Sequence, residues 1–119
     1  MPYVDGYVLS VPKRNLKAYR RVATLSGRVW REHGAIQYKE CVADDMNTGI
    51  GVPFARIVKP RRGETIVFAF VVFKSRAHRD RVNSKVISDP RLADLMRPGA
   101  MPFDVSRMAY GGFKVLVEA

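Results

Sequence analysis

The sequence contains little of what disulfide bonds and metal sites require. It has one cysteine, Cys41, and two histidines, His33 and His78. A single cysteine excludes an internal disulfide, which favours a reducing compartment. No HxxxH, CxxC or facial-triad spacing occurs, so we predict neither a metal site nor a cofactor.

Long apolar runs are also absent. The chain opens with Met-Pro-Tyr-Val-Asp, which has no cationic lead followed by an apolar stretch. No segment approaches the roughly 20 apolar residues that a transmembrane helix needs. We therefore expect neither a secretory signal nor a membrane contact, and we predict a cytoplasmic protein.

Acidic residues are scarce relative to basic ones. The chain has 21 Lys and Arg against 11 Asp and Glu, for a formal net charge of +10. Such a surplus favours nucleic acid, anionic ligands or acidic surfaces as partners, although a solvated basic surface is the simpler interpretation. The 119 residues and the 47% hydrophobic content indicate one globular domain over residues 1–119.

The hydrophobic periodicity predicts an alternating order of strands and helices. Strands are expected at 3–11, 35–43, 64–73 and 107–117, and helices at 16–33 and 75–87, with a short extra helix at 90–97. Residues 44–63 hold several glycines and prolines and are expected to form mostly loop. The order βαββαβ predicts an α+β, ferredoxin-like fold, a four-stranded antiparallel sheet with both helices on one face.

Local signals add detail to this outline. Asn15 and Ser75 stand where helix caps are expected. Gly27 lies inside the first helix, where it costs about 1 kcal/mol relative to alanine, so it indicates a close approach to a neighbour. The pair Gly111-Gly112 interrupts the last strand and indicates a bulge or a close backbone approach.

The third predicted strand is apolar on both faces. Two helices cover only one side of a four-stranded sheet, so Phe68 and Phe70 need another cover. Leaving them in water forgoes roughly 1.5–3 kcal/mol each. We therefore predict a homodimer in which a second copy covers this face. One face carries Ile66, Phe68, Phe70 and Val72, and the other Val67, Ala69, Val71 and Phe73.

Several long stretches resemble the YbaA-like family of uncharacterised bacterial proteins, namely PYVDGYVLSVPKRNLKAYR, VWREHGAIQYKECVADD, FKSRAHRDRVNSKV and FDVSRMAYGGFKVLV. The resemblance extends over nearly the whole chain and implies a dimeric α+β barrel, in which two ferredoxin-like subunits pack sheet against sheet. Cofactor-free monooxygenases of that superfamily use an Asn, a Trp and a His. Trp30 and His33 are present here, but Asp5 stands where the Asn is expected, which argues against that activity.

The leading functional hypothesis is a homodimer with a small-molecule cavity at the sheet interface. The candidate ligand-binding residues are Tyr7, Trp30, Arg56 and Tyr110, and the catalytic candidates are His33, Glu40 and Cys41. Whether the protein is an enzyme stays open at this point. For Trp30 the competing interpretation is a residue of the core.

Two of the catalytic candidates have specific partners in this hypothesis. Cys41 would act as a nucleophile only if His33 lay beside it, and otherwise it packs as a small apolar residue. Glu40 shares a strand face with Tyr38, and a carboxylate there either pairs with an arginine or has a raised pKa and serves as a base. The arginines expected to pair with it are Arg107 and Arg56.

The alternative hypothesis is nucleic-acid binding. The βαββαβ order is shared with the RNA-recognition motif, and residues 68–73 fit the last six places of its third-strand pattern, whereas Ile66-Val67 does not fit the first two. A dimer would also bury these aromatic rings. A second route is a phosphate-binding surface on the outer side of the helices. Its residues would be Arg14, Lys17, Arg21, Arg28, Arg31, Arg76, Arg79 and Lys85. A third hypothesis is an interaction protein without a site.

Overall fold

The computed structural model describes residues 1–119, apart from the side chain of Met96. Its elements in chain order are β1 (Tyr3–Pro12), η1 (Lys13–Asn15), α1 (Leu16–Glu32), β2 (Gln37–Val42), α2 (Phe54–Val58), β3 (Glu64–Phe73), α3 (Arg76–Ile87), η2 (Pro90–Met96), η3 (Val105–Arg107) and β4 (Ala109–Lys114). The strand order is β2-β3-β1-β4, with antiparallel neighbours throughout. The predicted βαββαβ fold is confirmed. In the part of the chain described, no helix has the length and apolar character to cross a membrane.

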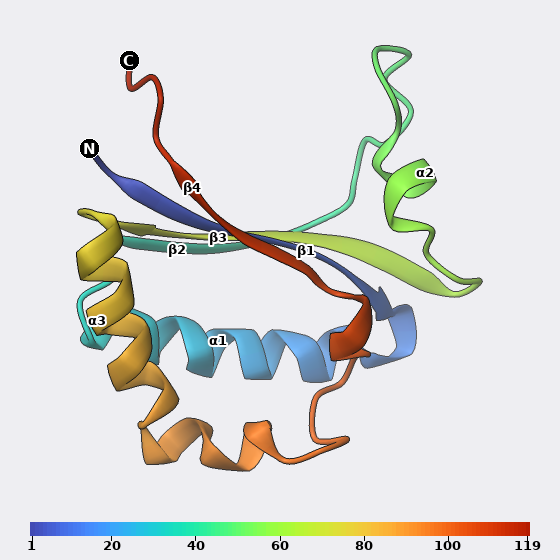
Figure 1. Ribbon diagram of the computed structural model, residues 1–119. Coiled ribbons are helices and arrows are strands. Elements are labelled where there is room, and N and C mark those ends of the chain that lie inside the picture. Colours follow the sequence, from blue (N-terminus) through green and yellow to red (C-terminus); the bar gives the residue numbers. More distant parts are fainter.

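The fold has two layers (Figure 1). Helices α1 and α3 cover one side of the sheet, which we call the helix face. The opposite side, the open face, carries no long helix. The connection formed by residues 43–63, with α2 in it, rises from the open face, and so does the chain after β4. The prediction that both long helices lie on one face is confirmed.

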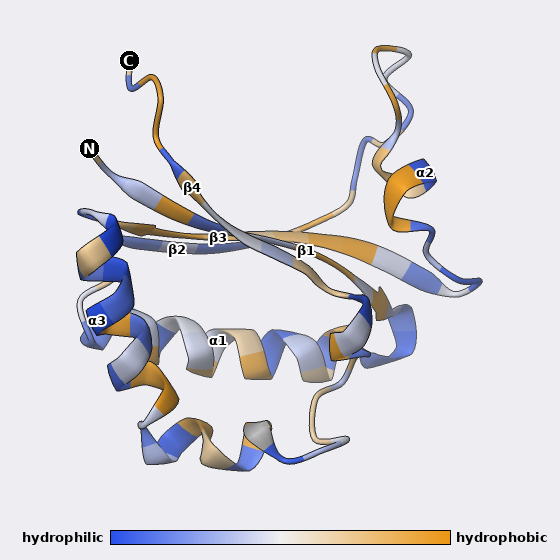
Figure 2. Cartoon of the chain, in the orientation of Figure 1, coloured by the Kyte–Doolittle hydropathy of each residue, from blue (hydrophilic) through white to orange (hydrophobic). Residues whose placement is uncertain are grey.

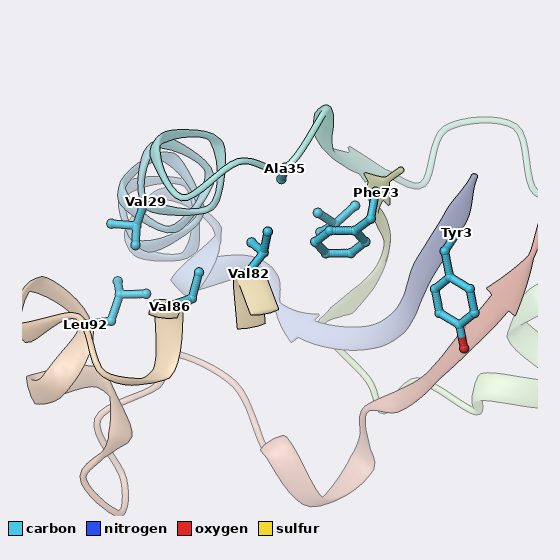
Figure 3. Packing of buried hydrophobic residues seen from close by; sticks show 8 residues of the cluster. Tyr3, Val29, Ala35, Phe73, Val82, Val86 and Leu92 are labelled. Atoms are coloured by element: carbon cyan, nitrogen blue, oxygen red, sulfur yellow. The ribbon is translucent and has the colours of Figure 1, made fainter. Parts of the chain in front are cut away.

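The core lies between the helix face and the two long helices. Strand β3 alternates, so that Val67, Val71 and Phe73 are buried beneath the helices. Figure 3 shows Val82 of α3 between Val86 and Phe73. Burying a side chain of this size contributes roughly 1.5–3 kcal/mol relative to leaving it in water.

The helix and strand ends match the sequence signals only in part. Ser75 caps α3, because its hydroxyl accepts a 3.1 Å hydrogen bond from the His78 backbone N–H. Asn15 does not cap α1. Asn15 is the last residue of the 3-10 turn η1, with φ −99° and ψ 0°, whereas a capping residue is usually extended. Its side-chain amide donates instead to the Pro102 carbonyl at 3.1 Å.

The predicted last strand, the predicted loop and one predicted distortion need adjustment. The last strand is shorter than expected, because Val105–Arg107 forms the 3-10 turn η3 before β4 begins. Helix α2 lies inside residues 44–63, which were expected to form mostly loop. β4 pairs with β1 without a bulge, with Gly112 opposite Asp5. The close approach at Gly112 is confirmed, since a Cβ there would lie 2.7 Å from Cε2 of Tyr3.

Candidate ligand pocket

A cavity of about 170 Å³ lies between α1 and the helix face of the sheet. Its walls come from β1, β2, β3, α1 and the segment 101–108, so that parts of the chain far apart in sequence meet around it. Most of the lining is apolar, and a few polar groups interrupt it. The lining residues are Tyr7, Leu9, Tyr19, Val22, Ala23, Ser26, Trp30, Tyr38, Glu40, Ala69, Val71, Met101, Phe103, Val105 and Met108.

Glu40 is the only carboxylate in this wall. One of its oxygens accepts a 2.5 Å hydrogen bond from the Tyr19 hydroxyl, and the other accepts one of 2.5 Å from the Tyr38 hydroxyl. Burial and the neighbouring carboxylate together raise the pKa of Tyr19 and of Tyr38 well above the usual range. Both phenols therefore stay protonated at neutral pH and hold the carboxylate as donors.

The predicted arginine partners of Glu40 are wrong. Arg107 donates to both oxygens of Glu64, each at 2.9 Å. Arg56 is exposed on α2, on the other side of the sheet. The edge strand β2 lies next to α1, so the donors that reach Glu40 are tyrosines of the helix and of the strand itself.

Tyr7 and Trp30 were predicted to bind a ligand at the interface of two paired sheets; here both line the cavity on the helix side of the sheet. The Tyr7 ring stacks on Tyr110, with 4.8 Å between ring centroids. Burial raises the pKa of Tyr7, and the described side chains offer its hydroxyl no hydrogen bond. The Trp30 indole N–H donates to Asn83 at 3.0 Å, which fixes the ring at the cavity wall.

A buried polar network begins beside the cavity, at Asp5. This carboxylate is fully buried and accepts hydrogen bonds from Arg79 at 2.9 Å, Asn83 at 3.1 Å and Tyr110 at 3.2 Å. Because Asn83 also accepts from Trp30, the network ties β1 to α3 and continues to the cavity wall. The expectation that Arg79 belongs to an outer basic surface is wrong, since its side chain points to Asp5.

The remaining candidates lie outside the cavity. His33 bonds to Asp89 at 2.8 Å, and the hydrogen bonds from Arg91 and then His33 lower the pKa of Asp89. Cys41 is exposed and opposes Phe68 in the sheet register. The structure therefore does not bring His33 and Cys41 together. Among the described residues, no three His, Cys, Asp or Glu side chains gather as a metal site.

A wide groove of about 970 Å³ runs between α1 and the edge strand β2. It shares four lining residues with the cavity, which places the two spaces side by side: Tyr19, Ala23, Tyr38 and Glu40. Basic side chains border it, and we call it the basic groove. They are Lys13, Lys17, Arg20, Arg28 and Arg31.

The open face of the sheet is apolar. Phe68 is 44% exposed there, and its ring lies 6.0 Å from that of Phe70. Phe54 of α2 borders a shallow groove with Ile66 and Phe68, so the 43–63 connection covers one end of this face only. Figure 2 shows the apolar colouring of β3 and α2. The apolar residues of the open face are Val4, Val8, Ile66, Phe68, Phe70, Val72 and Phe113.

These features define an α+β protein with ferredoxin-like strand order and a cavity on the helix side of its sheet. The chain belongs to the DUF1428 family, described as "Protein of unknown function", which matches residues 2–105. This confirms the resemblance seen in the sequence.

Individual relatives give the same result. The chain is 38% identical over 118 residues to "Uncharacterized protein YbaA" of Escherichia coli (strain K12), with 99% of each chain covered. The protein of the same name from Shigella flexneri gives the same figures. The solved structure of "De novo designed protein Foldit4" aligns with a TM-score of 0.49 at 10% identity, over 97% of this chain and 99% of that one, a similarity too low to support an argument.

Proposed function

We propose that this protein is a homodimer that binds a small molecule in the cavity between α1 and the sheet. The observation that carries the proposal is an apolar space of about 170 Å³ into which Tyr7 and Glu40 bring polar groups. An apolar protein cavity of about 150 Å³ accommodates benzene. The space therefore suits a ligand with one ring, oriented by a few polar contacts as in most ligand sites.

The largely apolar wall of the cavity favours an apolar group over water. A bound apolar group would gain roughly 25 cal/mol per Å² of apolar surface that it removes from water. If the molecule carries an acidic O–H or C–H group, Glu40 is the residue placed to take its proton.

The dimer part of the proposal rests on the open face. An exposed apolar surface centred on Phe68 and Phe70 is unusual for a monomer. A twofold axis would pair this face with itself and remove both surfaces from water. The 43–63 connection and the last residues of the chain rise on the same side and would flank the second copy (Figure 1). These segments carry the exposed apolar residues Ile50, Val52, Ile57, Leu116 and Val117. The cavity predicted between two paired sheets stays a prediction within this proposal.

Binding can be tested with toluene as the probe and Ser26→Leu as the variant. Ser26 is buried in the cavity wall on α1, and leucine there fills the space while favouring the helix. Toluene is expected to raise the melting temperature of the natural protein and not that of Ser26→Leu. Ser84→Leu, the same change at an exposed position of α3, serves as the control and should behave like the natural protein. An equal toluene response in all three would contradict the proposal.

A further inference from the structure

The basic groove and the cavity lie side by side, and both are lined by Tyr19, Ala23, Tyr38 and Glu40. We propose that the ligand is a small anion with one ring-sized apolar part, whose ring occupies the cavity and whose charged group lies in the basic groove. This inference rests on the proposed function and adds the chemical class of the ligand.

The charges of the groove support an anion. Lys17, Arg20 and Arg28 lie along one side of α1, and Lys13 precedes them. These four side chains make no ion pair with any carboxylate among the described residues. Arg31, in contrast, donates to the Ala35 carbonyl at 3.1 Å.

Arginines next to the interior elsewhere in the molecule have partners. Arg79 bonds to Asp5 at 2.9 Å, and Arg107 bonds to Glu64 at 2.9 Å. Arg20 and Arg28 are exposed cations beside a hollow, with no carboxylate paired to them among the described residues. A carboxylate or phosphate of a ligand matches the fork of an arginine guanidinium.

The groove fits a small molecule better than a nucleic-acid chain. Its lining includes the apolar residues Leu16 and Val67. Glu40 also faces it, and a carboxylate at this position repels a run of phosphates. The aromatic side chains of the lining, Tyr19 and Tyr38, are held by hydrogen bonds to Glu40, so they do not form a free stacking platform.

Glu40 also defines which end of the ligand enters. It lines both spaces. A second negative charge is unfavourable beside this half-buried carboxylate, so the ring enters the cavity and the anionic group stays among the basic side chains. The geometry thus selects a molecule with its charge at one end.

Calorimetric titration with three probes tests this inference. Phenyl phosphate carries ring and charge, benzyl alcohol carries the ring alone, and methyl phosphate carries the charge alone. We expect phenyl phosphate to bind at least about tenfold more tightly than either of the others, since charge-assisted hydrogen bonds and ring burial add.

Two doubly substituted proteins are compared. The groove pair carries Arg20→Gln and Arg28→Gln, and the control pair carries Arg62→Gln and Arg97→Gln. All four arginines are exposed, and both pairs remove the same charge. The groove pair should weaken phenyl phosphate binding by about tenfold or more and leave benzyl alcohol binding unchanged. The control pair should change neither.

Each other outcome overturns a defined part of the account. Equal affinity for phenyl phosphate and benzyl alcohol would leave the cavity as a binding site and reject the anionic class. Failure of every probe that carries a ring would reject the proposed function itself. Binding of a single-stranded RNA oligomer that the groove pair abolishes, without binding of phenyl phosphate, would show that the groove serves a polyanion.

Discussion

A Cβ atom on Gly27 would lie 2.8 Å from Cδ1 of Tyr38, so α1 and β2 approach each other as closely as the tyrosine ring permits. This contact holds the ring over the junction between the groove and the cavity, where its hydroxyl reaches Glu40. Glycine is unfavourable in helix interiors, but it occupies this position because a larger residue would collide with Tyr38.

Gly27→Ala is expected to destabilise the protein. Alanine favours the helix by about 1 kcal/mol, but overpacking against Tyr38 costs roughly 1–3 kcal/mol. In a Tyr38→Val background, which removes the δ carbons, the same Gly27→Ala change should become stabilising by about 0.5–1 kcal/mol. Denaturant unfolding of the four proteins measures the change in the free energy of unfolding caused by Gly27→Ala in each background. A change of the same sign in both backgrounds would contradict the close contact.

The sequence predicted the elements well where the pattern is local. Strand β3 has the predicted bounds, because continuous β-branched and aromatic residues end sharply at Gly63 and Lys74. Its two apolar faces are also confirmed. Tyr7, Trp30 and Glu40 were candidates for a cavity between paired sheets. All three line the cavity on the helix side instead, and their role in binding stays a prediction.

Contacts between distant elements were beyond the sequence. Which residue of α1 faces which residue of β2 depends on how the helix crosses the sheet, and local periodicity carries no information on that. The roles of Tyr19 and Asp5 were therefore missed. His33 has its partner, Asp89, 56 residues away in sequence, and was wrongly grouped with Cys41. A lone Asp in an apolar strand was the available signal for the buried network.

The Asp5–Arg79 pair predicts a large loss of stability when one partner is removed. Asp5 is fully buried, so Arg79→Met leaves an uncompensated charge, and this should cost roughly 3–5 kcal/mol. In an Asp5→Asn background the same Arg79→Met change should cost about 1–3 kcal/mol less. Denaturant unfolding of the natural protein, the two single variants and the double variant gives the coupling free energy between Asp5 and Arg79. An equal loss of stability from Arg79→Met in both backgrounds would contradict the pairing.

The Glu64–Arg107 pair predicts a pH dependence of stability. The hydrogen bonds from the Arg107 side chain and from the Arg61 backbone N–H lower the pKa of Glu64 from 4.5 to about 2. Between these values the unfolded chain binds the proton and the folded protein does not, so the stabilisation is complete above pH 4.5 and is lost as the pH falls to about 2.

Glu64→Gln makes this dependence measurable. The variant should be less stable than the natural protein by roughly 1–3 kcal/mol at neutral pH, and the difference should vanish near pH 2. Glu118→Gln, at an exposed position near the end of the chain, is the control and should show no such trend. A difference that stays constant down to pH 2 would refute the assignment to this carboxylate.

If the open face forms the proposed dimer, Phe68→Glu should disrupt it. Each copy would bring one buried, unpaired carboxylate to the interface. The dissociation constant of the dimer should therefore increase by roughly a hundredfold or more. Light scattering across a dilution series measures it. Ile87→Glu, at an exposed apolar position on α3, is the control and should leave the dimer intact. A natural protein that scatters as a monomer would contradict the pairing.

The most direct measurement is a crystal structure of the protein grown with phenyl phosphate. The account predicts a ring between Tyr7, Trp30 and Glu40, with the phosphate group beside Arg20 and Arg28. A cavity closed by the protein's own side chains, with the phosphate bound elsewhere or absent, would contradict it.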